Sequence, residues 1–325
     1  MSPDYRVAPS ADTPDEDAAD APWSDEPERR ETTVAAALHG ARLDKAVVAI
    51  AGEFSRSHLQ TLIEGGHVVV DGRVVTTASR KVAAGQRVVV ELVPTLQSQA
   101  FRPEPVPLSI VHEDPHLLVL DKAAGVVVHP AAGNWSGTLL NGLLSHHAGA
   151  AALPRAGIVH RLDKDTSGLM VVGKTTVAVT ALVRAIAARE VHRQYLAIAH
   201  GVPRAERMCI EAPIGRDPQS RIRMAVVAGG KPATTDVERI AGNDRFSGLR
   251  CTLHTGRTHQ IRVHLASRGH PLVADSVYGG APALGMQRQA LHAGHLGFVH
   301  PVTGEALRFE APMPQDFAAA WSQIH

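Results

Sequence analysis

The side chains best suited to chemistry lie in a polar string inside the stretch IVHRLDKDTSGLMVV. The string includes His160, Arg161 and Asp163, and it leads directly into an apolar run that predicts a buried strand. A capped turn in which Asp165 or Thr166 accepts hydrogen bonds from nearby amides would need only one or two such side chains. The excess of charged groups of both signs therefore favours a functional site over a simple turn.

A second polar cluster lies in TGRTHQIRVHLASRGHP, residues 255–271. If a helix begins at Thr258, His259 and Arg262 share one of its faces, and Arg257 lies just before it. Arginine and histidine at the start of a helix suit an anion or an RNA phosphate. The segment contains no acidic residue, so its positive charge needs a carboxylate from elsewhere in the chain or a ligand.

Together the two clusters predict a carboxylate, that of Asp163, held beside an arginine in a groove lined with basic residues. A guanidinium within about 4–6 Å favours the ionised form of a carboxylate. An ionised aspartate suits nucleophilic or base chemistry rather than acid catalysis. These residues indicate a class of chemistry and do not name the reaction.

Several enzyme classes are disfavoured by motifs that the chain lacks. There is no GxxxxGK[ST] loop, no GxGxxG after a strand and no GxSxG, so we expect no nucleotide cofactor. The two cysteines, Cys209 and Cys251, cannot form a disulfide framework or a cysteine-based zinc site. Among the 19 histidines, pairs such as His292 and His295 have no carboxylate in register to complete a helix-borne site. We therefore expect no metal and a reducing, cytoplasmic environment.

Composition and charge indicate a soluble protein with a polyanionic partner. The chain has 325 residues, of which 44% are hydrophobic, and no apolar run approaches the ~20 residues that cross a bilayer. Its start lacks the basic and apolar parts of a signal peptide. Residues 1–31 hold ten acidic residues against three arginines without hydrophobic periodicity, which predicts a disordered acidic tail. The remainder carries 30 basic and 22 acidic residues, a modest excess that suggests a polyanionic partner.

Residues 32–93 predict a small α/β module. Two segments with an apolar helical face come first, the second of them N-capped by Ser55 and ended by Gly65-Gly66. HVVV-DG-RVV then predicts a hairpin with Asp71-Gly72 at its turn. The stretches RLDKAV, SRSHLQTLIEGGHVVVDGRVV and RKVAAGQRVVV resemble an S4 RNA-binding domain. That resemblance implies phosphate contacts, which position RNA without reading its sequence. The candidate contacts are Arg42, Lys45, Arg56 and Ser57.

The rest of the chain predicts a linker and one larger domain. Residues 94–107 contain four prolines and little periodicity, which is typical of a linker. In residues 108–325, runs of strand length alternate with helical patterns near 175–189, near 258–268 and from about residue 314. Because many strands adjoin in sequence through short connections, we predict an α+β domain. Its central sheet should be mixed and mostly antiparallel, with flanking helices.

The larger region resembles the RluA family of pseudouridine synthases. The resemblance rests on HRLDKDTSGLMVVGK, VLDKAAGVVVHPAAGNWSGTLLNGLL, RQYLAIAHG, TGRTHQIRVHL, HPLVADSVYGG and RQALHAGHLGFVHPVTGE. With the S4-like module, the chain is most similar to the RluD-like subgroup, which acts on large-subunit ribosomal RNA. The resemblance implies the pseudouridine synthase fold and cofactor-free isomerisation of uridine to pseudouridine. Two departures are small: DKAAG replaces the usual DKPAG, and Ala274 stands where the family normally has glycine.

The resemblance also assigns catalytic roles to individual residues. Asp163 matches the essential aspartate, which attacks C1′ of the target uridine or takes its C2′ proton, and the sequence does not choose between these routes. Tyr195 matches the tyrosine whose ring stacks on the uracil and whose hydroxyl is a candidate to help remove the C5 proton. Arg262 matches the arginine that pairs with the aspartate, and Arg257 is the second candidate for that pairing.

Four residues are expected to bind the substrate around these catalytic groups: Arg161, His160, Arg257 and His259. By the same resemblance, Arg161 fills the vacated base stack or holds the displaced nucleotide. His160 shapes the turn rather than transferring protons.

Two other functions stay open on the sequence alone. Hydrolysis of an N-glycosidic bond could use the same carboxylate and would release free uracil. A non-catalytic RNA chaperone or ribosome-assembly factor could keep the S4-like module without the chemistry. The choice between ribosomal and transfer RNA is also open. We expect the chain to act as a monomer and away from membranes.

Overall fold

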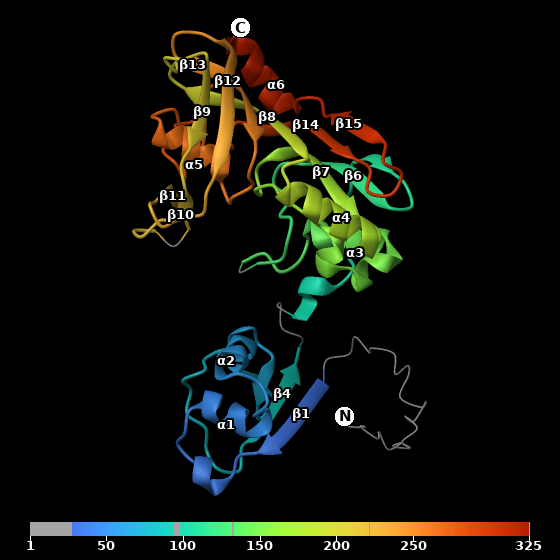
Figure 1. Cartoon of the computed structure of the whole chain (residues 1–325). Coiled ribbons are helices and arrows are strands. Elements are labelled where there is room, and N and C mark those ends of the chain that lie inside the picture. Colours follow the sequence, from blue (N-terminus) through green and yellow to red (C-terminus); the bar gives the residue numbers. More distant parts are fainter. Residues whose placement is uncertain (1–27, 94–97, 132, 221, 325) are drawn as a thin grey trace, which may run out of the picture. The chain divides into compact units, whose positions relative to one another are not determined.

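The computed structural model describes residues 28–93, 98–131, 133–220 and 222–324 (Figure 1). The chain divides into two compact units, Met1–Thr95 and Leu96–His325. Within the described ranges, no helix is long and apolar enough to cross a lipid bilayer.

The first unit packs two helices against an antiparallel sheet of order β1-β4-β2-β3. Ser55 caps the second helix, since its side chain accepts a hydrogen bond from the His58 amide at 3.3 Å. Asp71 and Gly72 have φ values of +49° and +78°, as the predicted two-residue hairpin turn requires. The cap and the hairpin predicted from the sequence are therefore confirmed. The elements are β1 Glu28–Thr33, α1 Leu43–Ile50, α2 Arg56–Glu64, β2 Val68–Val70, β3 Arg73–Val74 and β4 Arg87–Leu92.

Strand β1 corrects the predicted boundary of the acidic tail. Residues 28–31 belong to this strand, while residues 1–27 lie outside the described residues. All six residues of β1 pair with β4, and only Arg30 is partly buried. An edge strand held by main-chain hydrogen bonds needs no alternation of apolar side chains, so hydrophobic periodicity did not reveal it.

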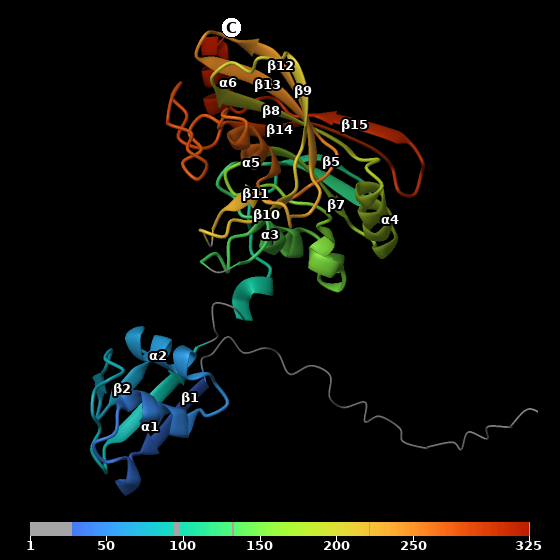
Figure 2. The ribbon, with the colours of Figure 1, turned by 60° about the vertical axis from the view of Figure 1, so that its left-hand side comes forward.

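The second unit is built on a mixed sheet of order β5-β6-β7-β14-β8-β13-β12-β9, with β15 beside β14. Figure 2 shows β8, β13, β12 and β9 lying side by side. All neighbouring strands are antiparallel except β7 and β14, which confirms the predicted α+β fold. The strands are β5 Ile110–Glu113, β6 Leu117–Lys122, β7 Ser167–Gly173, β8 His192–His200, β9 Arg207–Glu211, β12 Thr234–Gly242, β13 Phe246–Leu253, β14 Leu291–Val299 and β15 Ala306–Glu310.

Helices cover both faces of this sheet. The three helices predicted from the sequence are present as α4 Thr176–Ala187, α5 Gln260–Ser267 and α6 Gln315–Trp321. A further helix, α3, spans Leu139–His146. Alternate strand residues point to opposite faces. On β7, Met170 and Val172 pack with α3 and α5, whereas Leu169 and Val171 pack with α4. Tyr195 of β8 belongs to the α3 and α5 face. A separate hairpin is formed by β10 Ile214–Arg216 and β11 Met224–Val226.

The segment predicted to be a linker is anchored to the second unit by main-chain hydrogen bonds, although most of its described residues from 101 to 107 are exposed. Residues 94–97 lie outside the described residues, but residues 98–107 contact α3 through the buried Asn141. Its Nδ2 donates to the carbonyls of Ala100 and Arg102 at 3.2 and 2.8 Å. The Asn141 carbonyl accepts from the Glu104 amide at 3.1 Å. The proline-rich composition did not predict these bonds, because the partner amide lies 39 and 41 residues away in sequence.

Candidate active site

The second unit contains a cavity of about 830 Å³ beside β8, the start of α5 and the polar string before β7. Among the described residues that line it, Asp163 is the only acidic one. Six arginines line the same cavity: Arg155, Arg161, Arg189, Arg193, Arg257 and Arg262. A concave surface with this excess of positive charge suits a polyanion.

The turn that carries Asp163 is held through its main chain. The Asp163 carbonyl accepts a hydrogen bond from the Thr166 amide at 3.1 Å. The next carbonyl, that of Lys164, accepts from the Gly125 amide and from Lys122 Nζ, both at 2.9 Å. Lys122 is buried, and burial lowers its pKa to about 8. These bonds fix the turn and leave the Asp163 carboxylate 16% exposed at the cavity wall.

Arg262 joins Asp163 to a second, buried carboxylate. Its Nη1 donates to Asp163 Oδ2 at 3.0 Å, while Nε and Nη2 donate to the two oxygens of Asp275 at 2.7 and 2.9 Å. Arg262 is 5% exposed and Asp275 is 1% exposed. Burial alone would lower the pKa of Arg262, but the bonds to Asp275 and the charge of Asp163 raise it. A guanidinium fixed in this way presents one N–H to Asp163 in a defined direction.

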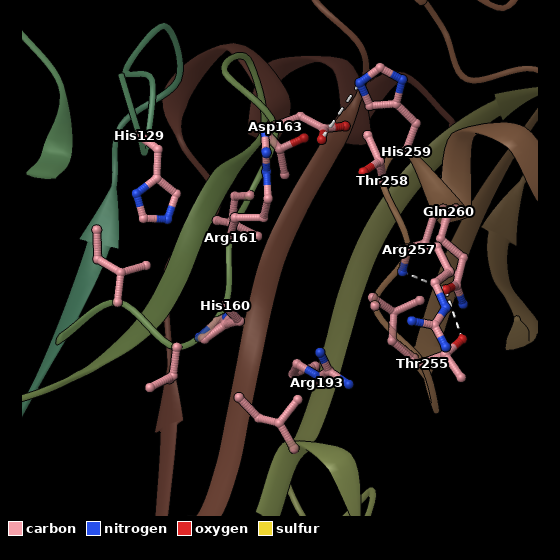
Figure 3. A pocket seen from close by; sticks show the side chains of 18 of the residues that line it. His129, His160, Arg161, Asp163, Arg193, Thr255, Arg257, Thr258, His259 and Gln260 are labelled. Atoms are coloured by element: carbon pink, nitrogen blue, oxygen red, sulfur yellow. Dashed lines mark hydrogen bonds and ion pairs between the residues drawn. The ribbon is translucent and has the colours of Figure 1, made fainter. Parts of the chain in front are cut away.

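His259 also approaches Asp163, although not from a helix face. The helix begins at Gln260 rather than at Thr258, and His259 precedes it in a left-handed conformation with φ of +56°. Its Nε2 lies 3.8 Å from Asp163 Oδ1 (Figure 3). Its Nδ1 lies 2.8 Å from the Tyr278 hydroxyl. Burial lowers the pKa of His259, so the ring is neutral at pH 7. The turn before the helix, rather than helical spacing, brings this side chain to the carboxylate.

Tyr195 lies in the middle of β8 and lines the cavity with a side chain that is largely buried. Burial raises the pKa of its hydroxyl to about 12. The phenol therefore keeps its proton at neutral pH, and the side chain contributes an aromatic group to the cavity wall.

His160 and Arg161 differ sharply in environment. His160 Nε2 accepts a hydrogen bond from the Val171 amide at 3.0 Å, which ties the polar string to β7. Burial, with a contribution from Arg193, lowers the pKa of His160 to about 3, so the ring is a neutral acceptor. Arg161 is exposed and lines the cavity, as Figure 3 shows.

Arg257 is directed away from the carboxylate. Its Nε donates to the Pro232 carbonyl at 3.1 Å, and its amide donates to Gln260 Oε1 at 3.0 Å. Arg257 and Asp163 lie apart in Figure 3. Of the two candidates for pairing with Asp163, the structure therefore brings Arg262 to it and not Arg257.

Three contributors to the site were not singled out from the sequence. Asp275 and Tyr278 lie in the stretch HPLVADSVYGG, where spacing alone identified no partner for them. Arg193 lies two residues before Tyr195 on β8, and strand alternation already places both side chains on one face. Ala274 has a φ of +58°, which is a strained conformation for alanine and explains why glycine suits this position.

Two of the four residues expected to contact RNA in the first unit, Arg42 and Arg56, bond to a buried carboxylate. Asp44 is fully buried, and it accepts hydrogen bonds from Arg42 Nη2 at 3.1 Å, Arg56 Nη2 at 2.8 Å and Gln60 Nε2 at 2.9 Å. The bonds from Arg42 are the main reason that the pKa of Asp44 lies well below its usual value. The two arginine side chains remain 46% and 54% exposed. Lys45 and Ser57 are also exposed.

No group of three or more histidine, cysteine, aspartate or glutamate side chains among the described residues is arranged to hold a metal ion.

Comparison with known proteins identifies the family. The profile of the RNA pseudouridylate synthase family matches residues 116–267, and that of the S4 domain matches residues 41–88. "Ribosomal large subunit pseudouridine synthase D" of Neisseria meningitidis serogroup B is 48% identical over 297 residues, covering 87% of this chain and 79% of the relative. The protein of the same name from Nitrosomonas europaea is 46% identical and covers 90% of this chain and 87% of the relative.

Solved structures agree with this assignment. "Human RNA Pseudouridylate Synthase Domain Containing 1" is 29% identical with a TM-score of 0.54, over 67% of this chain and 89% of that chain. "Human RNA Pseudouridylate Synthase Domain Containing 4" is 22% identical with a TM-score of 0.51, over 66% and 92%, and shows the fold alone. With an S4 domain in its first unit, this chain belongs to the RNA pseudouridylate synthase family and is an RNA pseudouridine synthase.

Proposed function

We propose that this enzyme isomerises uridines in large-subunit ribosomal RNA and that Asp163 carries out the first chemical step. Its curated relatives carry a ribosomal large-subunit target in their names. The observation that carries the catalytic assignment is the cavity itself, in which a single carboxylate is gripped by Arg262 and surrounded by basic side chains. A polyanionic strand is attracted to such a wall, and the carboxylate supplies the reactive oxygen.

In the proposed reaction, Asp163 attacks C1′ of the ribose or removes the C2′ proton. Either route breaks the N1–C1′ bond, after which the uracil turns and a C5–C1′ bond forms. N1 gains a proton and C5 loses one, so the product is an isomer of the substrate. Tyr195 holds the ring by stacking as a protonated phenol, because its pKa is raised to about 12 by burial.

The remaining candidate residues serve binding in this proposal. A uridine inside a helix or tight loop must flip out, at a cost of a few kcal/mol. Arg161 at the cavity wall holds the displaced nucleotide, and His160 supports the turn from behind. In the first unit, Arg42, Arg56, Lys45 and Ser57 contact phosphates. We also propose that the enzyme works as a monomer in the cytoplasm.

The test is carbodiimide mapping of pseudouridine in total RNA from cells with and without this protein. We expect specific sites in large-subunit ribosomal RNA to disappear when the protein is absent. Sites lost only from transfer RNA would overturn the proposed target. In vitro, tritium should be released from RNA that carries [5-³H]uridine, without free uracil. Free uracil would indicate the hydrolase, and no reaction at all would indicate a non-catalytic assembly factor.

A further inference from the structure

A second charged group in the cavity has no partner. Arg193 projects from β8 and lines the cavity, with only 5% of its surface exposed. It lies on the same strand face as Tyr195, two residues away. In Figure 3 Arg193 is set apart from Asp163 and His259, so it belongs to a different part of the same cavity.

Within the described part of the chain, Arg193 makes no hydrogen bond or ion pair through its side chain. Its Nε is fully buried without a partner, and no carboxylate lies within ion-pair distance of its terminal nitrogens. Arg262, buried to the same degree, has three charge-assisted hydrogen bonds. Buried charges in native proteins are normally paired, because an unpaired one forfeits its hydration without compensation. The cavity is where a partner for Arg193 could enter.

The surroundings of Arg193 leave room for an anion and supply none. Asp163 is the only acidic residue among the described lining residues, and it is already engaged by Arg262. A Cβ built on Gly256 would lie 3.0 Å from Arg193 Nη1, so the absence of a side chain there leaves room for the guanidinium itself. The neighbouring His160 is uncharged, since its pKa is lowered to about 3 by burial and by Arg193 itself.

We infer that Arg193, whose guanidinium is accommodated beside Gly256, binds a backbone phosphate of the RNA strand next to the target uridine. The inference rests on the proposed RNA substrate and adds the group by which the strand is held. A phosphodiester carries one negative charge and two free oxygens that fit the guanidinium fork. A neutral uracil carbonyl would leave the buried charge uncompensated. Tyr195 and Arg193 would then hold the base and the backbone of the same stretch of strand.

The test combines variants of Arg193 with RNA substrates in which single phosphates carry no charge. The substrate is any short RNA that the wild-type enzyme isomerises, so a wrong assignment within ribosomal RNA would not affect the result. In separate copies, each phosphate near the target is replaced by an uncharged methylphosphonate. For the wild type, we expect the methylphosphonate replacement at one particular linkage to lower kcat/KM by roughly 10- to 100-fold. Arg193→Gln should show a similar loss on unmodified RNA and no further loss at that linkage.

Two further variants separate binding from folding. Arg193→Lys keeps the charge without the fork, so it should retain part of the penalty at that linkage. Arg204→Gln removes an exposed arginine outside the cavity and should behave as the wild type. Thermal unfolding of each variant checks that it is folded. If folded Arg193→Gln loses the same factor as the wild type at every linkage, the phosphate assignment is wrong.

Discussion

The two units each contain a carboxylate bonded to arginine, but they expose opposite members of the pair. In the first unit Asp44 is fully buried, and the arginines that it holds, Arg42 and Arg56, are 46% and 54% exposed. In the second unit Arg262 is 5% exposed, and the Asp163 that it holds is 16% exposed at a cavity wall. The first arrangement presents cations to the solvent, and the second presents an anion to a cavity.

This difference shows that an ion pair does not by itself indicate a role. The buried member is fixed by its partners, while the exposed member stays available to a ligand. Exposed guanidiniums suit phosphate contacts, which position RNA. A partly exposed carboxylate held by a buried guanidinium suits a reaction in which the oxygen must be ionised and correctly aimed.

The largest effect on turnover should follow from removing the negative charge of Asp163. We expect Asp163→Asn to lower turnover by at least about 10⁴-fold, because no other described carboxylate lines the cavity. RNA affinity should stay within about tenfold, because the phosphate contacts are kept. Tritium release and filter binding measure the two quantities. Activity close to that of the wild type would remove Asp163 from the mechanism.

A smaller effect on turnover should follow from weakening the contacts that hold Arg262 beside Asp163. Asp275→Asn keeps the shape but removes the charge that holds Arg262 through two hydrogen bonds. We expect kcat to fall by roughly 10²–10³-fold with little change in KM, as for a misaligned catalytic group. Asp244→Asn, at an exposed turn, is the matched control and should leave kcat unchanged. A change confined to KM would place Asp275 in substrate binding instead.

In the first unit the corresponding change should affect binding and not chemistry. Arg42→Gln combined with Arg56→Gln should weaken RNA binding by about tenfold and make binding less dependent on salt. The rate at saturating RNA should be unchanged. Asp44→Asn is the sharper variant, since it releases both guanidiniums while adding net positive charge. We expect weaker binding, and tighter binding would show that charge alone matters there.

The smallest effect concerns acid stability and involves His160. Its pKa of about 3 in the folded chain, against 6.5 for the free side chain, means that the folded state favours the neutral ring. Its stabilising contribution is therefore complete above pH 6.5 and is lost as the pH falls toward 3. At pH 5.5 the loss should be about 1 kcal/mol.

Chemical unfolding of wild type and His160→Gln across this range measures the difference. The variant should lose less stability between pH 7 and pH 5. The pKa of Asp44 lies well below its usual value of 3.8, so the pairs in the first unit should persist over the same range. Identical pH profiles for the wild type and His160→Gln would contradict the neutral state of this half-buried histidine.

The sequence by itself determined the elements and the chemical groups. The hairpin at Asp71-Gly72, the cap at Ser55 and the mostly antiparallel sheet follow from turn chemistry and short-range periodicity, which act over a few residues. Asp163 stood out because its polar string is too highly charged for a turn. The family resemblance added Tyr195 and Arg262 as its partners.

Only the tertiary structure decided how those groups meet. Asp163 and Arg262 are 99 residues apart in the chain, so no local pattern could choose Arg262 over Arg257 or add Asp275 behind it. The same holds for burial, which leaves Arg193 without a partner among the described residues and leaves Asp163 as the more exposed member of its pair. Burial and charge pairing depend on which distant segments the fold packs together, and the spacing of residues along a chain does not contain that information.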